Sequence, residues 1–159
     1  MARSDDVLSF TVPPVVKTVT VRCPVATAFR QFAEDIAAWW PLATHHIGNE
    51  PESCVIEGRV GGRVFERDAK GTETLWGIVQ TWEPPHRLAF TWQVNIPPEQ
   101  AQRIDVTFTP VADGTRIELV HSGWEKLGPA GARRRENYDK GWVRVFEQCF
   151  AAYANAASA

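Results

Sequence analysis

Residues 138–153 have the sequence YDKGWVRVFEQCFAAY. In this stretch large apolar residues recur at spacings of four, three, four and four, with two phenylalanines beside them: Tyr138, Trp142, Val145, Cys149 and Tyr153, flanked by Phe146 and Phe150. Such spacing places apolar side chains on one face of an α-helix. The pattern therefore predicts one helix over residues 133–153 whose Tyr138–Trp142–Val145–Cys149 stripe faces a sheet, with Cys149 in the core.

The sheet that this helix needs is predicted upstream. Residues 15–21 are rich in β-branched side chains, and a helix or helix pair follows from Pro24 in its first turn to the corner at Trp39-Trp40-Pro41. Six more strands, separated by turns containing Gly or Pro, are expected at 53–57, 63–67, 73–82, 87–95, 104–108 and 115–122, with loops at 41–52 and 123–131. Strands joined by short turns pair antiparallel, so we expect an α+β fold with helices on one face of an antiparallel sheet.

Composition excludes several classes of protein. The chain has 159 residues, enough for one domain, and its 44% hydrophobic and 23% charged residues are typical of globular proteins. The net charge of −2 argues against nucleic-acid binding, and no apolar run is long enough for a membrane span. Because no hydrophobic signal core follows Met1, we expect a cytoplasmic protein with a loose lead-in at 1–14 and a single domain at 15–155. The three cysteines form no CxxC pair and are expected to be free thiols.

Tryptophan is the unusual component of this composition. The chain has seven tryptophans, at positions 39, 40, 76, 82, 92, 124 and 142. Each indole can bury a large apolar area and carries one N–H that needs a partner. A large aromatic core and a wide aromatic cavity are both consistent with this number.

Several short sequence strings, in this order along the chain, make the prediction of the fold more specific. They are Trp39-Trp40-Pro41, Gly61-Gly62-Arg63-Val64-Phe65-Glu66, Trp82-Glu83-Pro84-Pro85-His86-Arg87-Leu88, His121-Ser122-Gly123-Trp124 and Gly141-Trp142. Together, over residues 15–155, they resemble the bacterial proteins related to the activator of Hsp90 ATPase, within the START/Bet v 1-like (SRPBCC) superfamily. The resemblance implies a helix-grip fold: a curved sheet of about seven strands that grips the C-terminal helix, with two short helices after the first strand and a deep, mostly apolar cavity. The superfamily holds carriers, receptors and enzymes, so the fold leaves the function open.

Few residues suggest catalytic or metal chemistry. His45 and His46 are adjacent with no third ligand at a fixed spacing, so we expect no metal and interpret them as a loop pair near the cavity mouth. No phosphate-binding loop occurs, and no cofactor is expected. His121 shares a strand face with Ile117 and Leu119, which makes it a candidate polar group in an apolar setting. Glu57 and Glu66 are candidate acids or bases if their strand faces point inward.

We therefore predict a pocket between the sheet and the last helix that binds a small apolar or aromatic molecule. Its expected ligand-binding residues are Trp40, Glu66, Trp76, Phe90, Trp92, His121, Trp142 and Phe146, with His121 or a tryptophan N–H orienting one polar group of the ligand. Two alternatives stay open. One is a cyclase, dehydratase or hydrolase that uses His121 or Glu66 in the same cavity, and the other is a module that interacts with a chaperone or regulator. A homodimer also stays open.

Overall fold

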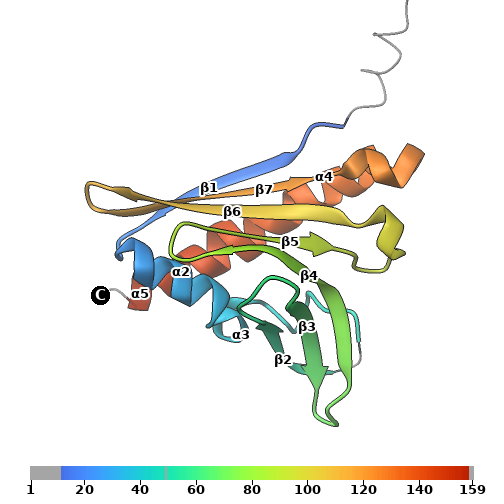
Figure 1. Cartoon of the computed structure of the whole chain (residues 1–159), viewed down its shortest axis with the longest axis horizontal. Helices are drawn as coiled ribbons and strands as arrows, with labels where there is room; N and C mark the ends of the chain where they lie inside the picture. Colours follow the sequence, from blue (N-terminus) through green and yellow to red (C-terminus); the bar gives the residue numbers. More distant parts are fainter. Residues whose placement is uncertain (1–11, 49, 158–159) are drawn as a thin grey trace, which may run out of the picture.

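A seven-stranded antiparallel sheet wraps around one long C-terminal helix in the computed structural model, which describes residues 12–48 and 50–157 (Figure 1). The strands are β1 (Val15–Val21), β2 (Pro51–Ile56), β3 (Arg63–Asp68), β4 (Glu73–Glu83), β5 (Arg87–Trp92), β6 (Gln102–Val111) and β7 (Gly114–Ser122). Their spatial order is β1-β7-β6-β5-β4-β3-β2. The helix-grip fold expected from the sequence is confirmed. The first eleven residues of the expected lead-in at 1–14 lie outside the described residues.

The sheet curves because its β2–β4 half contains irregular pairings. The register shifts between Pro51 and Ser53, between Val64 and Phe65, and between Val79 and Thr81. Each such bulge bends a strand and increases its local twist. At Gly77 in β4, an added Cβ would collide with the carbonyl oxygen of Thr91 in β5, so only glycine permits this close approach of the two strands.

Two short helices, α2 (Val25–Ala33) and α3 (Ile36–Trp39), follow β1. The apolar positions of α2 predicted this helix correctly, although Pro24 lies just before the helix rather than in its first turn. Phe29 and Phe32 of α2 pack against Phe108 of β6, with ring centroids 5.1 and 5.9 Å apart. These contacts close one end of the core beneath the sheet.

The C-terminal helix runs without a break through α4 (Gly131–Trp142), a π-helical segment (Val143–Phe150) and α5 (Ala151–Ala157), and in Figure 1 it lies behind the sheet. It is longer than the 133–153 predicted, and the preceding stretch, expected as a loop, contains the 3₁₀ helix Trp124–Ala130. A shorter 3₁₀ turn, Pro98–Gln100, lies between β5 and β6. Strand β5 ends at Trp92, earlier than the expected Asn95.

The placement of Cys149 in the core is wrong: this cysteine is only half-buried. Besides Val145, which was predicted to be buried, the helix buries residues four apart, namely Trp142, Phe146, Phe150 and Ala154. A π-helical turn holds more residues than an α-helical turn because its hydrogen bonds join residues five apart. Side chains four apart therefore stay on the face toward the sheet, and the shift removes Cys149 from that face. All three cysteines are free, as expected.

Candidate functional site

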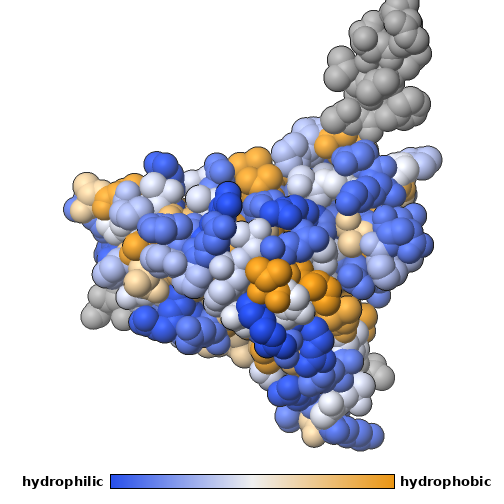
Figure 2. Space-filling view, in the orientation of Figure 1, coloured by the Kyte–Doolittle hydropathy of each residue, from blue (hydrophilic) through white to orange (hydrophobic). Residues whose placement is uncertain are grey.

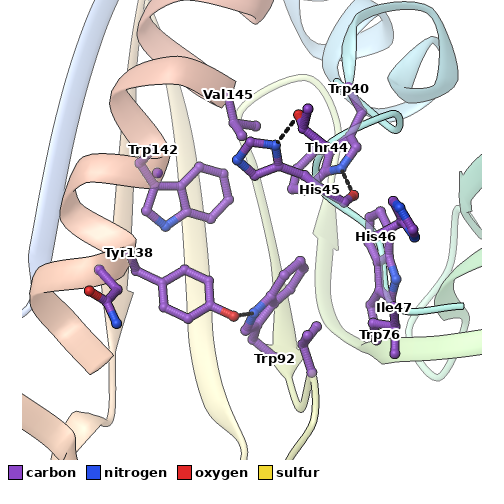
Figure 3. A pocket seen from close by; sticks show the side chains of 13 residues that line it. Trp40, Thr44, His45, His46, Ile47, Trp76, Trp92, Tyr138, Trp142 and Val145 are labelled. Carbon is purple, nitrogen blue, oxygen red and sulfur yellow. Dashed lines mark hydrogen bonds between the residues drawn. The ribbon is translucent and has the colours of Figure 1, made fainter. Parts of the chain in front are cut away.

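A pocket of about 270 Å³ lies between the sheet, the loop at 41–48 and the C-terminal helix. Its walls, shown in Figure 3, are formed by Trp40, Thr44, His45, His46, Ile47, Trp76, Trp92, Val94, Asn137, Tyr138, Gly141, Trp142 and Val145. Thr44, His46 and Asn137 are exposed, so they mark the mouth of the pocket. The aromatic residues therefore surround a space and do not form a solid core at this place.

Four tryptophans from four separate elements meet at this pocket. Trp40 follows α3, Trp76 is on β4, Trp92 ends β5 and Trp142 ends α4. The ring centroid of Trp40 lies 5.0 Å from that of Trp76, 6.1 Å from that of Trp92 and 5.9 Å from that of Trp142. These separations are typical of favourable aromatic pairs, so the four rings stabilise one another as well as lining the space.

Every indole N–H of these four tryptophans already has a protein partner. Trp40 donates to the carbonyl oxygen of His45 at 2.9 Å, and Trp76 donates to Glu66 Oε1 at 2.8 Å. Trp92 donates to Tyr138 Oη at 2.8 Å, and Trp142 donates to His121 Nδ1 at 3.0 Å. In this structure none of these four N–H groups is left free to orient a ligand, although the sequence had led us to expect this of one of them. The walls present ring faces and edges to the pocket, with no spare indole donor.

His121 is buried as predicted, but it does not reach the pocket. Because an indole N–H can only donate, the bond from Trp142 shows that Nδ1 of His121 carries no proton. The proton is then on Nε2, which lies 3.3 Å from Gln102 Oε1. Burial lowers the pKa of His121 to about 3, so the ring is neutral. Both ring nitrogens have partners within the protein, so the structure shows no free nitrogen for the ligand-orienting role expected of His121.

Glu66 is also buried, and it fixes the loop that covers the pocket. Its carboxylate accepts hydrogen bonds from the backbone N–H groups of Ile47 and Gly48, both at 2.7 Å, in addition to the bond from Trp76. A carboxylate that accepts several N–H bonds makes strong, directional contacts. Glu66 thus joins the loop to the floor of the pocket and is not one of the residues that line it.

Of the eight residues predicted to bind a ligand, four line the pocket: Trp40, Trp76, Trp92 and Trp142. The other four are buried behind its walls: Glu66, Phe90, His121 and Phe146. Tyr138 and Gly141 also line the pocket and were not predicted to do so, although both lie in the helical stretch 138–153. Nothing in the sequence indicated that Ile47, in the loop, lines the pocket.

The polar groups of the site do not form a recognisable catalytic set. Among the described residues, no three His, Cys, Asp or Glu side chains are grouped as a metal site would need. Glu57, one candidate base, is half-buried and forms ion pairs with Arg59 and Arg63 outside the pocket. Burial, with the charge of Glu66, raises the pKa of Cys54 to about 12, so this thiol is not an activated nucleophile. Within the described ranges, no carboxyl–imidazole hydrogen bond is present in the pocket.

The outer face of the sheet, away from the C-terminal helix, is mostly hydrophilic (Figure 2). Hydrophobic side chains gather on it over β3 and β4. The large hydrophobic residues that are exposed in the described part of the chain are Val60, Leu75 and Val16, with 66%, 37% and 48% of their surfaces accessible. Val16 lies on β1 at the opposite edge of the sheet, and isolated residues of this kind are ordinary. The exposed hydrophobic side chains of this face are thus one group over β3 and β4 and the separate Val16.

No helix in the described part of the chain has both the length and the apolar character to cross a membrane.

One family model matches most of the chain, and solved structures share its fold. The family model for "Activator of Hsp90 ATPase homolog 1-like protein" matches residues 22–155. An anthrahydroquino-gamma-pyrone synthase complexed with SUM has 33% sequence identity and a TM-score of 0.59, and the match covers 90% of this chain and 97% of that one. The self-sacrificing resistance protein CalC from Micromonospora echinospora has 29% identity and a TM-score of 0.70, with 91% and 96% covered. Protein NE0264 from Nitrosomonas europaea, at 13% identity and a TM-score of 0.64 over 92% and 96%, shares the fold alone. The search of curated proteins gave no match.

Proposed function

The chain belongs to the Activator of Hsp90 ATPase homolog 1-like family, and we propose that it binds a small, largely apolar or aromatic molecule in the tryptophan pocket. The fold and the buried aromatic cluster are consistent with a ligand-binding domain. The observation that carries the proposal is the meeting of four tryptophans around an open space while each N–H is bonded elsewhere. The four indoles can therefore offer a ligand only apolar and aromatic contact.

The size of the pocket restricts the ligand. Its volume of about 270 Å³ lies just below the range of roughly 300–1,000 Å³ in which small-molecule sites usually fall. A flat molecule of one or two aromatic rings therefore suits the space better than a long lipid chain. Burial of its apolar surface and offset contacts with the indole rings would supply most of the affinity.

Catalysis in the same pocket is a second candidate function. Two observations favour it: the relative with 33% identity is a synthase, and Thr44, His45 and His46 place polar groups at the mouth. Binding remains the better-supported function because the described residues in the pocket hold no paired acid and base. Conversion of a bound aromatic substrate, monitored through the change in its absorption spectrum, would support catalysis.

The test of binding compares two aromatic-to-alanine substitutions. Trp142→Ala removes a wall residue that already borders empty space, so we expect it to cost about 3 kcal/mol or less of unfolding free energy. Phe108→Ala removes a side chain packed in the core against Phe29 and Phe32, so we expect a cost of about 3–5 kcal/mol. Denaturant midpoints measure both costs.

Fluorescence titration with aromatic probes of increasing size supplies the second measurement. Trp142→Ala enlarges the pocket and should weaken binding or shift the preference toward bulkier probes, whereas folded Phe108→Ala should keep the parent's preference. If the parent protein binds no probe, or if both variants change binding alike, the proposal is wrong and the tryptophans serve only to pack the protein.

A further inference from the structure

Tyr138 differs from the other aromatic residues of the pocket because it carries a hydroxyl. It stands on α4, and its ring packs against the rings of His121 and Trp124, with centroids 5.0 and 5.4 Å away. Figure 3 shows the hydroxyl pointing across the pocket toward Trp92. The packing of the ring therefore fixes the position of the hydroxyl in the pocket wall.

The hydrogen bonds at this hydroxyl leave its own proton without an acceptor. A phenol has one O–H donor and can also accept hydrogen bonds. The indole N–H of Trp92 can only donate, so Tyr138 Oη is the acceptor in their 2.8 Å bond. The neighbouring guanidinium of Arg134 can likewise only donate to this oxygen. In the described part of the chain no group accepts the proton of Tyr138, and it remains available to a molecule in the pocket.

We propose that Tyr138 selects the ligand by donating this proton to an acceptor oxygen, such as a carbonyl oxygen on an aromatic ring system. This inference rests on the proposed function, because it assigns the polar part of the ligand to one place in the same pocket. The four tryptophan N–H groups are already bonded, so among the tryptophans and tyrosines that line the pocket Tyr138 is the one with a donor to spare.

Two positive charges beside the pocket favour an oxygen acceptor over a cationic ligand, while the Glu66 carboxylate behind the floor is directed to three N–H donors. Aromatic cages commonly bind ammonium groups through the faces of their rings, and four tryptophans would suit that use. However, Arg134 is close enough to Tyr138, and Arg144 to His45, for their positive charges to lower the pKa of these neighbours. Two arginines beside the pocket would repel a cation and attract the partial negative charge of a carbonyl oxygen. Burial, which is the larger effect, raises the pKa of Tyr138, so the phenol keeps its proton.

The test uses three naphthalene probes of similar shape: 2-acetylnaphthalene with a carbonyl oxygen, 2-isopropylnaphthalene without one, and a trimethylammonium derivative. Tyr138→Phe removes the hydroxyl and keeps the ring. The matched control is Tyr153→Phe, since Tyr153 is the other tyrosine of the chain and its hydroxyl donates to Asp35, away from the pocket. Dissociation constants are measured by titration, with denaturant midpoints to show that each variant folds.

We expect Tyr138→Phe to weaken binding of the ketone by about three- to tenfold, the usual contribution of one hydrogen bond, and to change binding of the hydrocarbon by less than about twofold. Tyr153→Phe should change neither. Equal changes for ketone and hydrocarbon would overturn the inference, as would tighter binding of the ammonium probe than of the ketone. If none of the probes binds the parent protein, the proposed function itself fails.

A second measurement needs no variant. The carbonyl stretching band of bound 2-acetylnaphthalene should lie at a lower frequency than in a hydrocarbon solvent, because a hydrogen bond weakens the C=O bond. A band at the frequency found in the hydrocarbon would overturn the inference even if Tyr138→Phe does not fold.

Discussion

Replacing Gly141 by alanine should stabilise the protein and narrow its pocket at the same time. Glycine within a helix costs about 0.5–1 kcal/mol relative to alanine, so its presence needs a reason. A tight contact is not that reason, because an added Cβ at Gly141 would meet no atom within 4 Å. The space beside Gly141 belongs to the pocket. We infer that glycine stands there to leave room for a ligand.

The expected size of the effect follows from this geometry. With no clash to offset the gain, Gly141→Ala should recover about 0.5–1 kcal/mol of unfolding free energy. For a chain of this size, that corresponds to a rise in Tm of about 1–4 °C. Gly141→Leu should also fold, but its longer side chain would occupy part of a space of only about 270 Å³ and should weaken binding of a two-ring probe.

Thermal unfolding and probe titration together test this prediction. Gly77→Ala is the control, because its Cβ would collide with the Thr91 carbonyl and should destabilise the sheet. Two results would refute the reasoning. One is a lower Tm for Gly141→Ala, which would show a close contact at this position. The other is undiminished probe binding by Gly141→Leu, which would show that the space beside Gly141 is not used.

Two further predictions concern the buried polar residues. Glu66→Gln replaces an acceptor of three N–H bonds by an amide with only one acceptor oxygen. We expect it to lower the free energy of unfolding by about 1–3 kcal/mol and to weaken probe binding. Unchanged denaturant midpoints would contradict the role of Glu66 in holding the loop. His121 has a folded-state pKa of about 3, below its ordinary value of 6.5, so the unfolded chain binds an extra proton between these pH values and stability falls as pH is lowered. From pH 7 to pH 5 this one group should lower the free energy of unfolding by about 2 kcal/mol, and His121→Gln should lose that part of the pH dependence. An identical pH dependence of stability in parent and variant would show that the ring is not held neutral.

Local patterns in the sequence account for most of the fold. The strand expected at 87–95 is present as β5, although it ends at Trp92, and the spacing around Trp142 predicted the long helix. The periodicity of hydrophobic residues and the positions of turn residues are local properties, so they can be recognised without knowledge of tertiary contacts. The π-helical segment changed which face of the helix is buried, and nothing in the spacing of Cys149 indicated that change.

The site was predicted less completely because its details depend on contacts between distant elements. Trp142 and Phe146 are four residues apart and both buried, yet only Trp142 borders the pocket. The burial of His121 followed from strand alternation, but the bonds that occupy its ring come from Trp142, 21 residues away, and from Gln102, 19 residues away. Tyr138 stood in the predicted stripe, while the importance of its hydroxyl depends on Trp92.

The most direct test of a ligand pocket is to record the seven indole N–H signals of ¹⁵N-labelled protein by NMR during titration with 2-acetylnaphthalene. The signals of the four lining tryptophans, Trp40, Trp76, Trp92 and Trp142, should shift and saturate together, while those of Trp39, Trp82 and Trp124 stay in place. Two results would contradict binding in the tryptophan pocket: no signal saturates, or Trp82 alone responds, from a second pocket that it lines with Phe29 and Arg30 of α2.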